Sequence, residues 1–211
     1  MKERAVFDPG CRDCPRLAAF HDQNNLQFPG YHNGPVGAFG DEQPDLLIVG
    51  LAPGLHGANA TNRPFTGDYA GVLLYETLHR YGFATAPVSE SAEDDLRLIG
   101  ARITNAVKCV PPQNKPVGEE IRQCNRFLQQ EIEVLHPKLM LALGKIAHDA
   151  VIRALGHKQA AFKFAHAAEH NLGQGLLLLD SYHCSRYNTN TRRLTEDMFH
   201  AVFARAREIV G

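Results

Sequence analysis

Four mostly apolar segments, each about the length of a β-strand, are spaced along the chain. They lie at residues 45–51, 101–110, 138–144 and 175–182. After Asp45, the first segment is a continuous apolar run, without the alternation of a strand that has one face in water. Such runs are typical of strands buried on both faces of a parallel sheet.

The segments between these strands have apolar residues at helical spacing. They predict helices over 70–81, 119–135, 145–155 and 191–210. Strands that alternate with helices indicate an α/β fold, so we predict one domain over residues 1–211. Its four-stranded, mostly parallel sheet is flanked by helices on both faces. Residues 1–40 show little periodicity beyond a helical turn at 15–21, which predicts an N-terminal arm that wraps the core.

Polar loops follow three of the predicted strands. Ligands of α/β proteins bind beyond the carboxyl ends of the parallel strands. The loops at residues 52–68, 105–114 and 183–191 all begin at such ends. The pattern therefore predicts that these three loops form one site.

Composition and charge narrow the function only slightly. The chain has 211 residues, 44% of them hydrophobic, and a formal net charge of −1. No apolar run approaches the roughly 20 residues of a membrane span, and the first residues show no signal-peptide pattern. We therefore expect a cytoplasmic protein without membrane contact. The net charge does not indicate a nucleic-acid-binding protein, but residues 183–193 carry three arginines and no acid.

Four of the five cysteines form two pairs. Cys11 and Cys14 have the C-x-x-C spacing, whereas Cys109 and Cys124 are separated by a proline-rich loop and part of a helix. Four thiolates fit an iron–sulfur cubane or a structural zinc ion. Separate buried cysteines remain the alternative. Because the chain is expected to be cytoplasmic, a disulfide framework is disfavoured.

Several motifs in one order resemble the iron–sulfur uracil-DNA glycosylases, and most closely their family 5 type. The resembling segments are 11–17, 50–54, 56–59, 63–68, 108–116 and 181–191. The resemblance implies a parallel sheet of four strands and a [4Fe–4S] cluster held by Cys11, Cys14, Cys109 and Cys124. It also implies that DNA is the partner and that uracil, and other deaminated bases such as hypoxanthine, are excised.

Excision needs a flipped base, a stabilised anionic leaving group and a water at the sugar carbon. The resemblance places His183 against the base carbonyl. The loop after Gly50 offers backbone N–H groups, but Leu51 and Ala52 offer no polar side chain. The water is therefore expected to be positioned by Asn59 or Asp68, and the sequence does not choose between these two catalytic candidates.

The remaining candidates are expected to contact the base or the DNA backbone. Gly50 and Ala52 allow close approach of the base, Phe65 is a platform for stacking, and Asn105 can read a pyrimidine edge. Three residues after the histidine are expected to bind DNA, namely Ser185, Arg186 and Asn188. The chain departs from the family at Cys184, where proline is usual, which predicts a looser turn or an exposed thiol.

Three alternatives remain. A family 4 type enzyme shares fold and cluster but carries an acidic residue where this chain has Leu51. A silent module that binds DNA damage is motivated by Ala52 and Cys184. A zinc-stabilised nucleotide-binding protein is the third alternative.

The other histidines form no H-E-x-x-H motif, so we expect no hydrolytic metal site among them. Nothing calls for a dimer, and we expect a monomer.

Overall fold

A computed structural model describes residues 7–211, so the first six residues of the predicted arm lie outside the described part. A six-stranded sheet with the order β1-β3-β2-β4-β6-β5 forms the centre. Its four inner strands are parallel. They are β2 (Leu46–Gly50), β3 (Ala101–Asn105), β4 (Leu139–Leu143) and β6 (Leu177–Ser181). These four strands confirm the predicted α/β class.

Two short antiparallel strands at the edges were not predicted. Strand β1 (Phe39–Gly40) pairs with β3, and β5 (Glu169–Asn171) pairs with β6. Strands of two and three residues are too short to show any periodicity in the sequence. The prediction of four strands is therefore corrected to six, and the second predicted strand ends at Asn105 rather than at residue 110.

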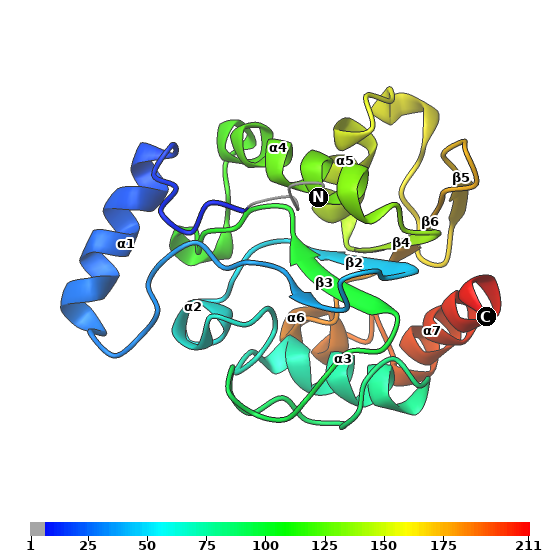
Figure 1. Ribbon diagram of the computed structural model, residues 1–211, viewed down its shortest axis with the longest axis horizontal. Helices are drawn as coiled ribbons and strands as arrows, with labels where there is room; N and C mark the ends of the chain where they lie inside the picture. Colours follow the sequence, from blue (N-terminus) through cyan, green and yellow to red (C-terminus); the bar gives the residue numbers. More distant parts are fainter. Residues whose placement is uncertain (1–6) are drawn as a thin grey trace.

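Both faces of the sheet are covered, which explains the continuous apolar run of β2. Leu46 and Ile48 pack with helices α3 (Tyr69–Arg80) and α7 (Glu196–Val210). Leu47 and Val49 pack with α4 (Gly118–Leu135) and α5 (Lys145–Ala154). Figure 1 shows α4 and α5 on one side of the sheet and α3 and α7 on the other. Successive side chains of a strand point to opposite faces, so each face needs its own apolar set.

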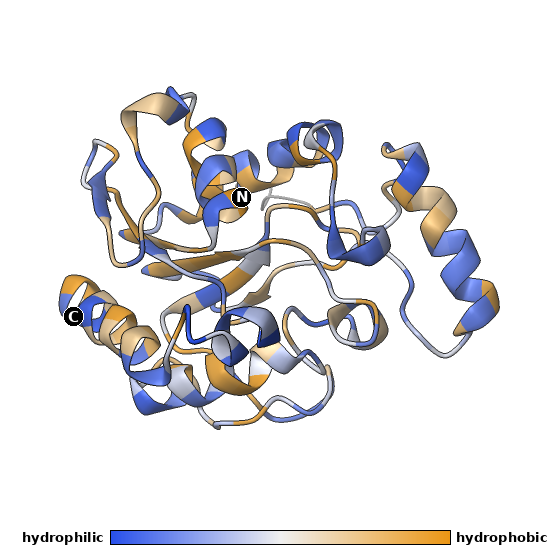
Figure 2. Ribbon diagram, turned by 180° about the vertical axis from the view of Figure 1, so that it is seen from behind, coloured by the Kyte–Doolittle hydropathy of each residue, from blue (hydrophilic) through white to orange (hydrophobic). Residues whose placement is uncertain are grey.

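The N-terminal arm contains a longer helix than predicted. Helix α1 (Pro15–Gln27) extends well past the expected turn at 15–21. Its residues are mostly hydrophilic, as Figure 2 shows, and its buried positions include His21 and Asn24. A helix with so few apolar positions leaves no helical hydrophobic pattern in the sequence.

The predicted closing helix is divided in two. Helix α6 (Arg186–Asn190) precedes a turn, and α7 begins only at Glu196. The side chain of Thr195 accepts a hydrogen bond from the Met198 N–H at 3.2 Å and so caps the start of α7. A helix α2 (Ala58–Thr61) and two 3₁₀ turns, Pro112–Asn114 and Gln159–Ala161, complete the regular structure. Over residues 7–211, none of the helices combines the length and hydrophobicity that a membrane crossing requires.

A buried ion pair joins the end of β3 to α4. Lys108 Nζ donates to Glu131 Oε1 at 2.8 Å, and Thr104 Oγ1 donates to Glu131 Oε2 at 2.8 Å. Both charged side chains are almost entirely excluded from water. Because desolvation of two charges is costly, such a pair is stable only while both partners are present.

Removal of one partner should therefore cost more than removal of both. We expect Lys108→Met to lower the free energy of unfolding by about 3–5 kcal/mol, since it leaves Glu131 buried and unpaired. The double variant Lys108→Met/Glu131→Leu should recover most of that loss in urea unfolding. Lys138→Met, which breaks the exposed pair with Asp45, is the control and should cost less than about 1 kcal/mol. Equal losses in the single and double variants would contradict this account.

Candidate active site

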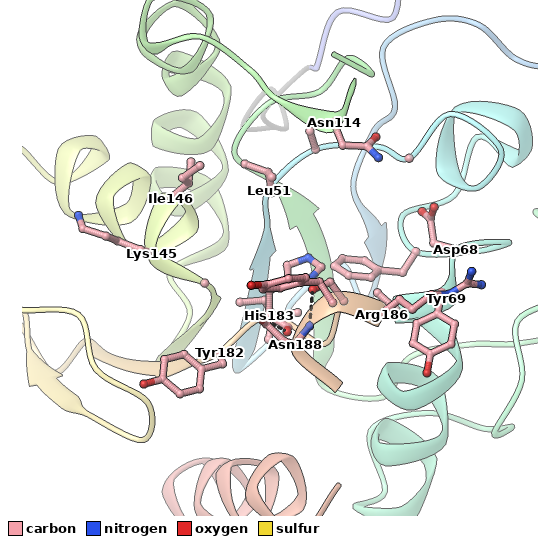
Figure 3. A pocket seen from close by; sticks show the side chains of 18 of the residues that line it. Leu51, Asp68, Tyr69, Asn114, Lys145, Ile146, Tyr182, His183, Arg186 and Asn188 are labelled. Atoms are coloured by element: carbon pink, nitrogen blue, oxygen red, sulfur yellow. Dashed lines mark hydrogen bonds between the residues drawn. The ribbon is translucent and has the colours of Figure 1, made fainter. Parts of the chain in front are cut away.

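A cavity of about 590 Å³ lies at the carboxyl ends of the four parallel strands. Residues from all three predicted loops line it, including Ala52, Asp68, Asn105, Asn114 and His183. Figure 3 shows Asp68, Tyr69 and Arg186 on one side of His183, and Lys145, Ile146 and Tyr182 on the other. The three loops thus meet in one site, at the location that the strand pattern predicts.

Two glycines make room for the carboxylate of Asp68. A β-carbon at Gly54 would lie 2.0 Å from Asp68 Oδ1, and a β-carbon at Gly57 would lie 2.0 Å from Asp68 Cγ. The carboxylate Oδ2 accepts a hydrogen bond from the Ala58 N–H at 3.2 Å. The glycines of this loop therefore serve to admit an acidic side chain, which lines the cavity.

Burial raises the pKa of Asp68, although backbone hydrogen bonds from Ala58 and Gly54 act in the opposite direction. A carboxylate held in partly dehydrated surroundings has a stronger affinity for a proton. Such a group is suited to accept a hydrogen bond, or a proton, from a water molecule in the cavity.

Asn59, the other candidate for water positioning, does not line the cavity. Its side chain is fully buried, and its Nδ2 donates to Asn33 Oδ1 at 3.0 Å. This bond ties α2 to the segment that follows α1. Of the two candidates, only Asp68 has access to the site.

Phe65 is held in a left-handed backbone conformation, with φ of 63°. A bulky residue rarely adopts this conformation unless its surroundings enforce it. Tyr75 donates to the neighbouring carbonyl of Pro64 at 2.7 Å, and the buried Arg63 binds Asp94 and the Ala92 carbonyl. The Phe65 carbonyl also leaves no room for a β-carbon at Gly71.

The ring of Phe65 closes one side of the cavity. It stacks on the ring of His183 with centroids 5.9 Å apart and an angle of 25° between the planes. Its edge lies above Gly50, where a β-carbon would come within 2.8 Å of it. This arrangement leaves an aromatic surface available to the cavity, as expected of a stacking platform.

Asn105 ends β3 directly beside Gly50, to which it is paired across the sheet. Its side chain is buried and lines the cavity, and its Oδ1 has no hydrogen-bond partner. A buried acceptor without a partner is costly unless a ligand or water satisfies it. Asn105 is therefore placed to bind a polar group inside the cavity.

His183 lies at the centre of the cavity, two residues after the end of β6. Its Nδ1 is buried and has no hydrogen-bond partner. Burial lowers the pKa of His183 to about 4, so the ring is neutral at pH 7. The amide of Asn188 donates to the His183 carbonyl at 2.8 Å and fixes its backbone.

The rim of the cavity carries the positively charged residues. Arg186 lies over the ring of Tyr69 at 4.7 Å, and Arg193 lies over that of Tyr182 at 4.6 Å. Within residues 7–211, neither arginine forms an ion pair with an acid, so both remain available to an anionic ligand. Ser185 also lines the cavity, and its Oγ accepts from the Asn188 N–H at 3.4 Å.

Several lining residues were given no individual role by the sequence. They are Asn114, Tyr69, Lys145, Phe164, Tyr182 and Tyr187. Asn114 lies within a motif that the sequence analysis used for the resemblance, and it reaches the cavity because two successive residues, Gln113 and Asn114, have positive φ. Tyr182 and Tyr187 also lie in a segment used for the resemblance, whereas Tyr69, Lys145 and Phe164 come from positions that no local pattern distinguishes.

Cys184, which replaces the usual proline, is not an exposed thiol. Its side chain is completely buried, and its Sγ lies 3.4 Å from the Ala70 carbonyl. Burial raises the pKa of this thiol to about 12. The residue packs the turn against α3, so the expectation of an exposed thiol is wrong.

The other four cysteines lie together outside the cavity, near the segment that follows β3. They line a second, smaller pocket with Leu17, Val107 and Phe127. Cys14 precedes α1, Cys109 follows β3 and Cys124 lies on α4, so the group joins the arm to the core. The Lys108 N–H donates to Cys124 Sγ at 3.2 Å. Burial, and then the charge of neighbouring groups including Cys124, raises the pKa of Cys14 to about 11.

Comparisons with known proteins show the family of this chain. The family model of the uracil DNA glycosylase superfamily matches residues 38–207. A type-5 uracil-DNA glycosylase of Thermus thermophilus is 44% identical over 207 residues, which cover 95% of this chain and 94% of that protein. A type-5 enzyme of Pyrobaculum aerophilum is 37% identical over 95% of this chain and 89% of that protein. A type-4 enzyme of the same organism matches only 61% of this chain and 58% of that protein, at 36% identity.

The low pKa of His183 predicts a pH-dependent stability. In the unfolded chain this histidine has its ordinary pKa of 6.5, but in the folded protein burial lowers the pKa to about 4. The neutral ring therefore contributes stability above pH 6.5 that is lost as the pH falls to about 4. We expect the free energy of unfolding to fall up to about 3 kcal/mol further in the wild type than in His183→Gln over this range. The exposed His136→Asn is the control, and it should behave as the wild type.

Proposed function

The chain belongs to the uracil-DNA glycosylase superfamily and to its type-5 branch, and from this premise we propose that it excises uracil from DNA by hydrolysing the N-glycosidic bond. The product is DNA with an abasic site. The observation that carries this proposal is the cavity that gathers His183, Phe65, Asn105 and Asp68 at the strand ends. Hypoxanthine and other deaminated bases are further substrates that we propose, as the family resemblance implies.

The base of a flipped nucleotide enters the cavity beside Phe65. The ring supplies a stacking surface, and the amide of Asn105 supplies both a donor and an acceptor for the pyrimidine edge. Gly50 and Ala52 leave space for close approach of the base. The unpaired Asn105 Oδ1 supports this assignment, since a bound base would satisfy it.

His183 stabilises the departing base. As the glycosidic bond breaks, negative charge develops on the base and positive charge on the sugar. A neutral imidazole fixed by Phe65 and by the bond to its carbonyl can donate a hydrogen bond to the base oxygen without prior proton uptake. A donor already in place needs no reorganisation during the reaction, which is the source of its catalytic effect.

Asp68 positions the attacking water. Leu51 and Ala52 provide no polar side chain, so the carboxylate between Gly54 and Gly57 is the acidic group that reaches the cavity. It accepts a hydrogen bond from the water and stabilises the positive sugar. Asn114, which lies above His183 in Figure 3, is a second polar group available to the water. Asn59 contributes through the fold of α2 and not by contact with substrate.

The rim binds the DNA backbone. Arg186 and Arg193 are held over aromatic rings and carry no internal counter-charge, which suits them to phosphate. Ser185 offers a hydroxyl at the same edge. Asn188 supports the segment through the His183 carbonyl and reaches the cavity as well.

Cys11, Cys14, Cys109 and Cys124 fit a [4Fe–4S] cluster. A single zinc ion with bonds of about 2.3 Å would hold its four sulfur atoms only about 3.8 Å apart. Among the described residues, no three of these thiols come within 4.8 Å of one another. A cubane places each thiolate on a separate iron and needs the wider spacing. The cluster braces the loop between Cys109 and Cys124 and supplies no step of the reaction.

Excision tests the proposed function. Purified protein incubated with uracil-containing duplex DNA should leave strands that alkali cleaves. We expect His183→Ala to lower the excision rate by about 10²–10³, the cost of one lost donor to a developing anion. Asp68→Asn should lower the rate by about 10² or more. Asp95→Asn, at an exposed acid away from the cavity, is the matched control. Tight binding of uracil-DNA without any excision would instead favour the silent module.

Loss of a cluster cysteine should have a different effect. We expect Cys109→Ser to abolish the visible absorbance of the iron–sulfur cluster and to lower the melting temperature, because the arm loses its link to the core. His183→Ala should keep both the absorbance and the melting temperature close to those of the wild type. Colour and unfolding are measured on the same samples. Loss of both in the His183 variant would contradict this division of roles.

A further inference from the structure

A buried cluster of two histidines and an aspartate lies outside the cavity, on the face of the sheet covered by α5. His148 comes from α5, His170 from β5 and Asp180 from β6. One possible ligand atom of each residue lies within 4.8 Å of the others. His148 and Asp180 are fully excluded from water, and the His170 side chain is 13% exposed. In β6 this carboxylate follows three leucines, Leu177 to Leu179.

The protons of His148 can be assigned from its contacts. Nε2 lies 3.0 Å from the Phe162 carbonyl oxygen, which only accepts hydrogen bonds, so Nε2 carries a hydrogen. In a neutral ring Nδ1 then carries a lone pair, and it faces Asp180 Oδ1 at 2.8 Å. Two lone pairs at this distance repel each other. A cation must therefore lie between them, either a second proton or a metal ion.

His170 adds a third ligand to the same place. Its Nε2 lies 3.0 Å from Asp180 Oδ2. Within residues 7–211, no lysine or arginine lies within ion-pair distance of Asp180. A fully buried carboxylate without such a partner is costly unless it is paired or coordinates a metal.

We propose that His148, His170 and Asp180 bind one Zn²⁺ ion. Zinc bonds of about 2.0–2.2 Å at tetrahedral angles place neighbouring ligand atoms about 3.3 Å apart, so the observed nitrogen–oxygen distances need to open by only a few tenths of an ångström. The hydrogen bond from His148 Nε2 to a backbone carbonyl is the outer contact usual for a metal-bound histidine, and it leaves Nδ1 free to coordinate.

The surroundings favour a four-coordinate ion. The ring of Phe164 packs edge-on against His148 with centroids 5.7 Å apart, and the ring of Phe162 packs against His170 at 5.9 Å. These rings leave little space for the several waters that a six-coordinate ion requires. Three protein ligands and one water complete a zinc site in this space.

The ion joins parts of the fold that approach the active site. It ties α5 to β5 and β6, and the Phe162 contact holds the start of the segment at 162–168 against α5. That segment supplies Phe164 to the cavity wall, and its His166 Nδ1 accepts from the Tyr182 N–H at 3.1 Å. The role of the metal is structural. The inference does not depend on the proposed glycosylase activity.

Metal content and cobalt spectroscopy test the proposal. Untagged holoprotein with its cysteine site loaded should bind one zinc per chain in equilibrium dialysis. Zinc at about 100 times its dissociation constant should raise the melting temperature by about 5–10 °C. In a difference spectrum against the same protein without cobalt, cobalt bound in place of zinc should add visible d–d bands but no new thiolate charge-transfer bands. The absence of those bands separates this site from the cysteine site.

Asp180→Asn and His170→Ala should each lose the bound metal and the rise in melting temperature. His157→Gln, at a histidine outside the cluster, should keep both. His170 is partly exposed, so its variant reports on the site even if Asp180→Asn fails to fold. The proposal is overturned if the wild type binds no zinc at saturation, in which case a proton occupies the gap, or if His170→Ala binds zinc as the wild type does.

Discussion

The active site depends on four positions where the chain has no room for a β-carbon. At Gly54 and Gly57 the carboxylate of Asp68 occupies the space that a β-carbon would need. At Gly50 the side chains of Phe65 and Asn105 occupy it. At Gly71 it belongs to the backbone of Phe65. The site is therefore assembled by close approach of segments that are distant in sequence. Larger residues at these positions would move the functional groups before they disturbed the hydrophobic core.

The sheet was predictable because its inner strands are buried on both faces. Leu46 to Val49 alternate between two separate clusters of apolar side chains, so the segment has no polar position at all. Helix α1 was underestimated for the opposite reason, since its inward face includes His21 and Asn24. Strands β1 and β5 form because they pair with the neighbouring strands β3 and β6. Nothing in two or three residues indicates such pairing.

The sequence predicted the location of the site only for those residues that follow the ends of the parallel strands. His183, Asp68, Phe65 and Asn105 line one cavity because parallel strands bring their loops to the same edge. Asn59 lies on the same loop as Asp68, nine residues before it. Nothing in the sequence indicates that the Asn59 side chain turns inward to Asn33. Asp180 and His148 are 32 residues apart, and their contact follows from the packing of α5 on β6. Contacts between elements of this kind leave no local pattern.

The neutral state of His183 also has a consequence for turnover. An imidazolium ion would bind the anionic base strongly after the bond has broken, and the base would then leave the cavity slowly. A neutral ring, kept so by its burial beside Phe65, offers one hydrogen bond and no net charge. Once the base takes up a proton, little holds it in place. On the proposed mechanism, the burial that costs the folded protein stability in acid thus favours release of the product.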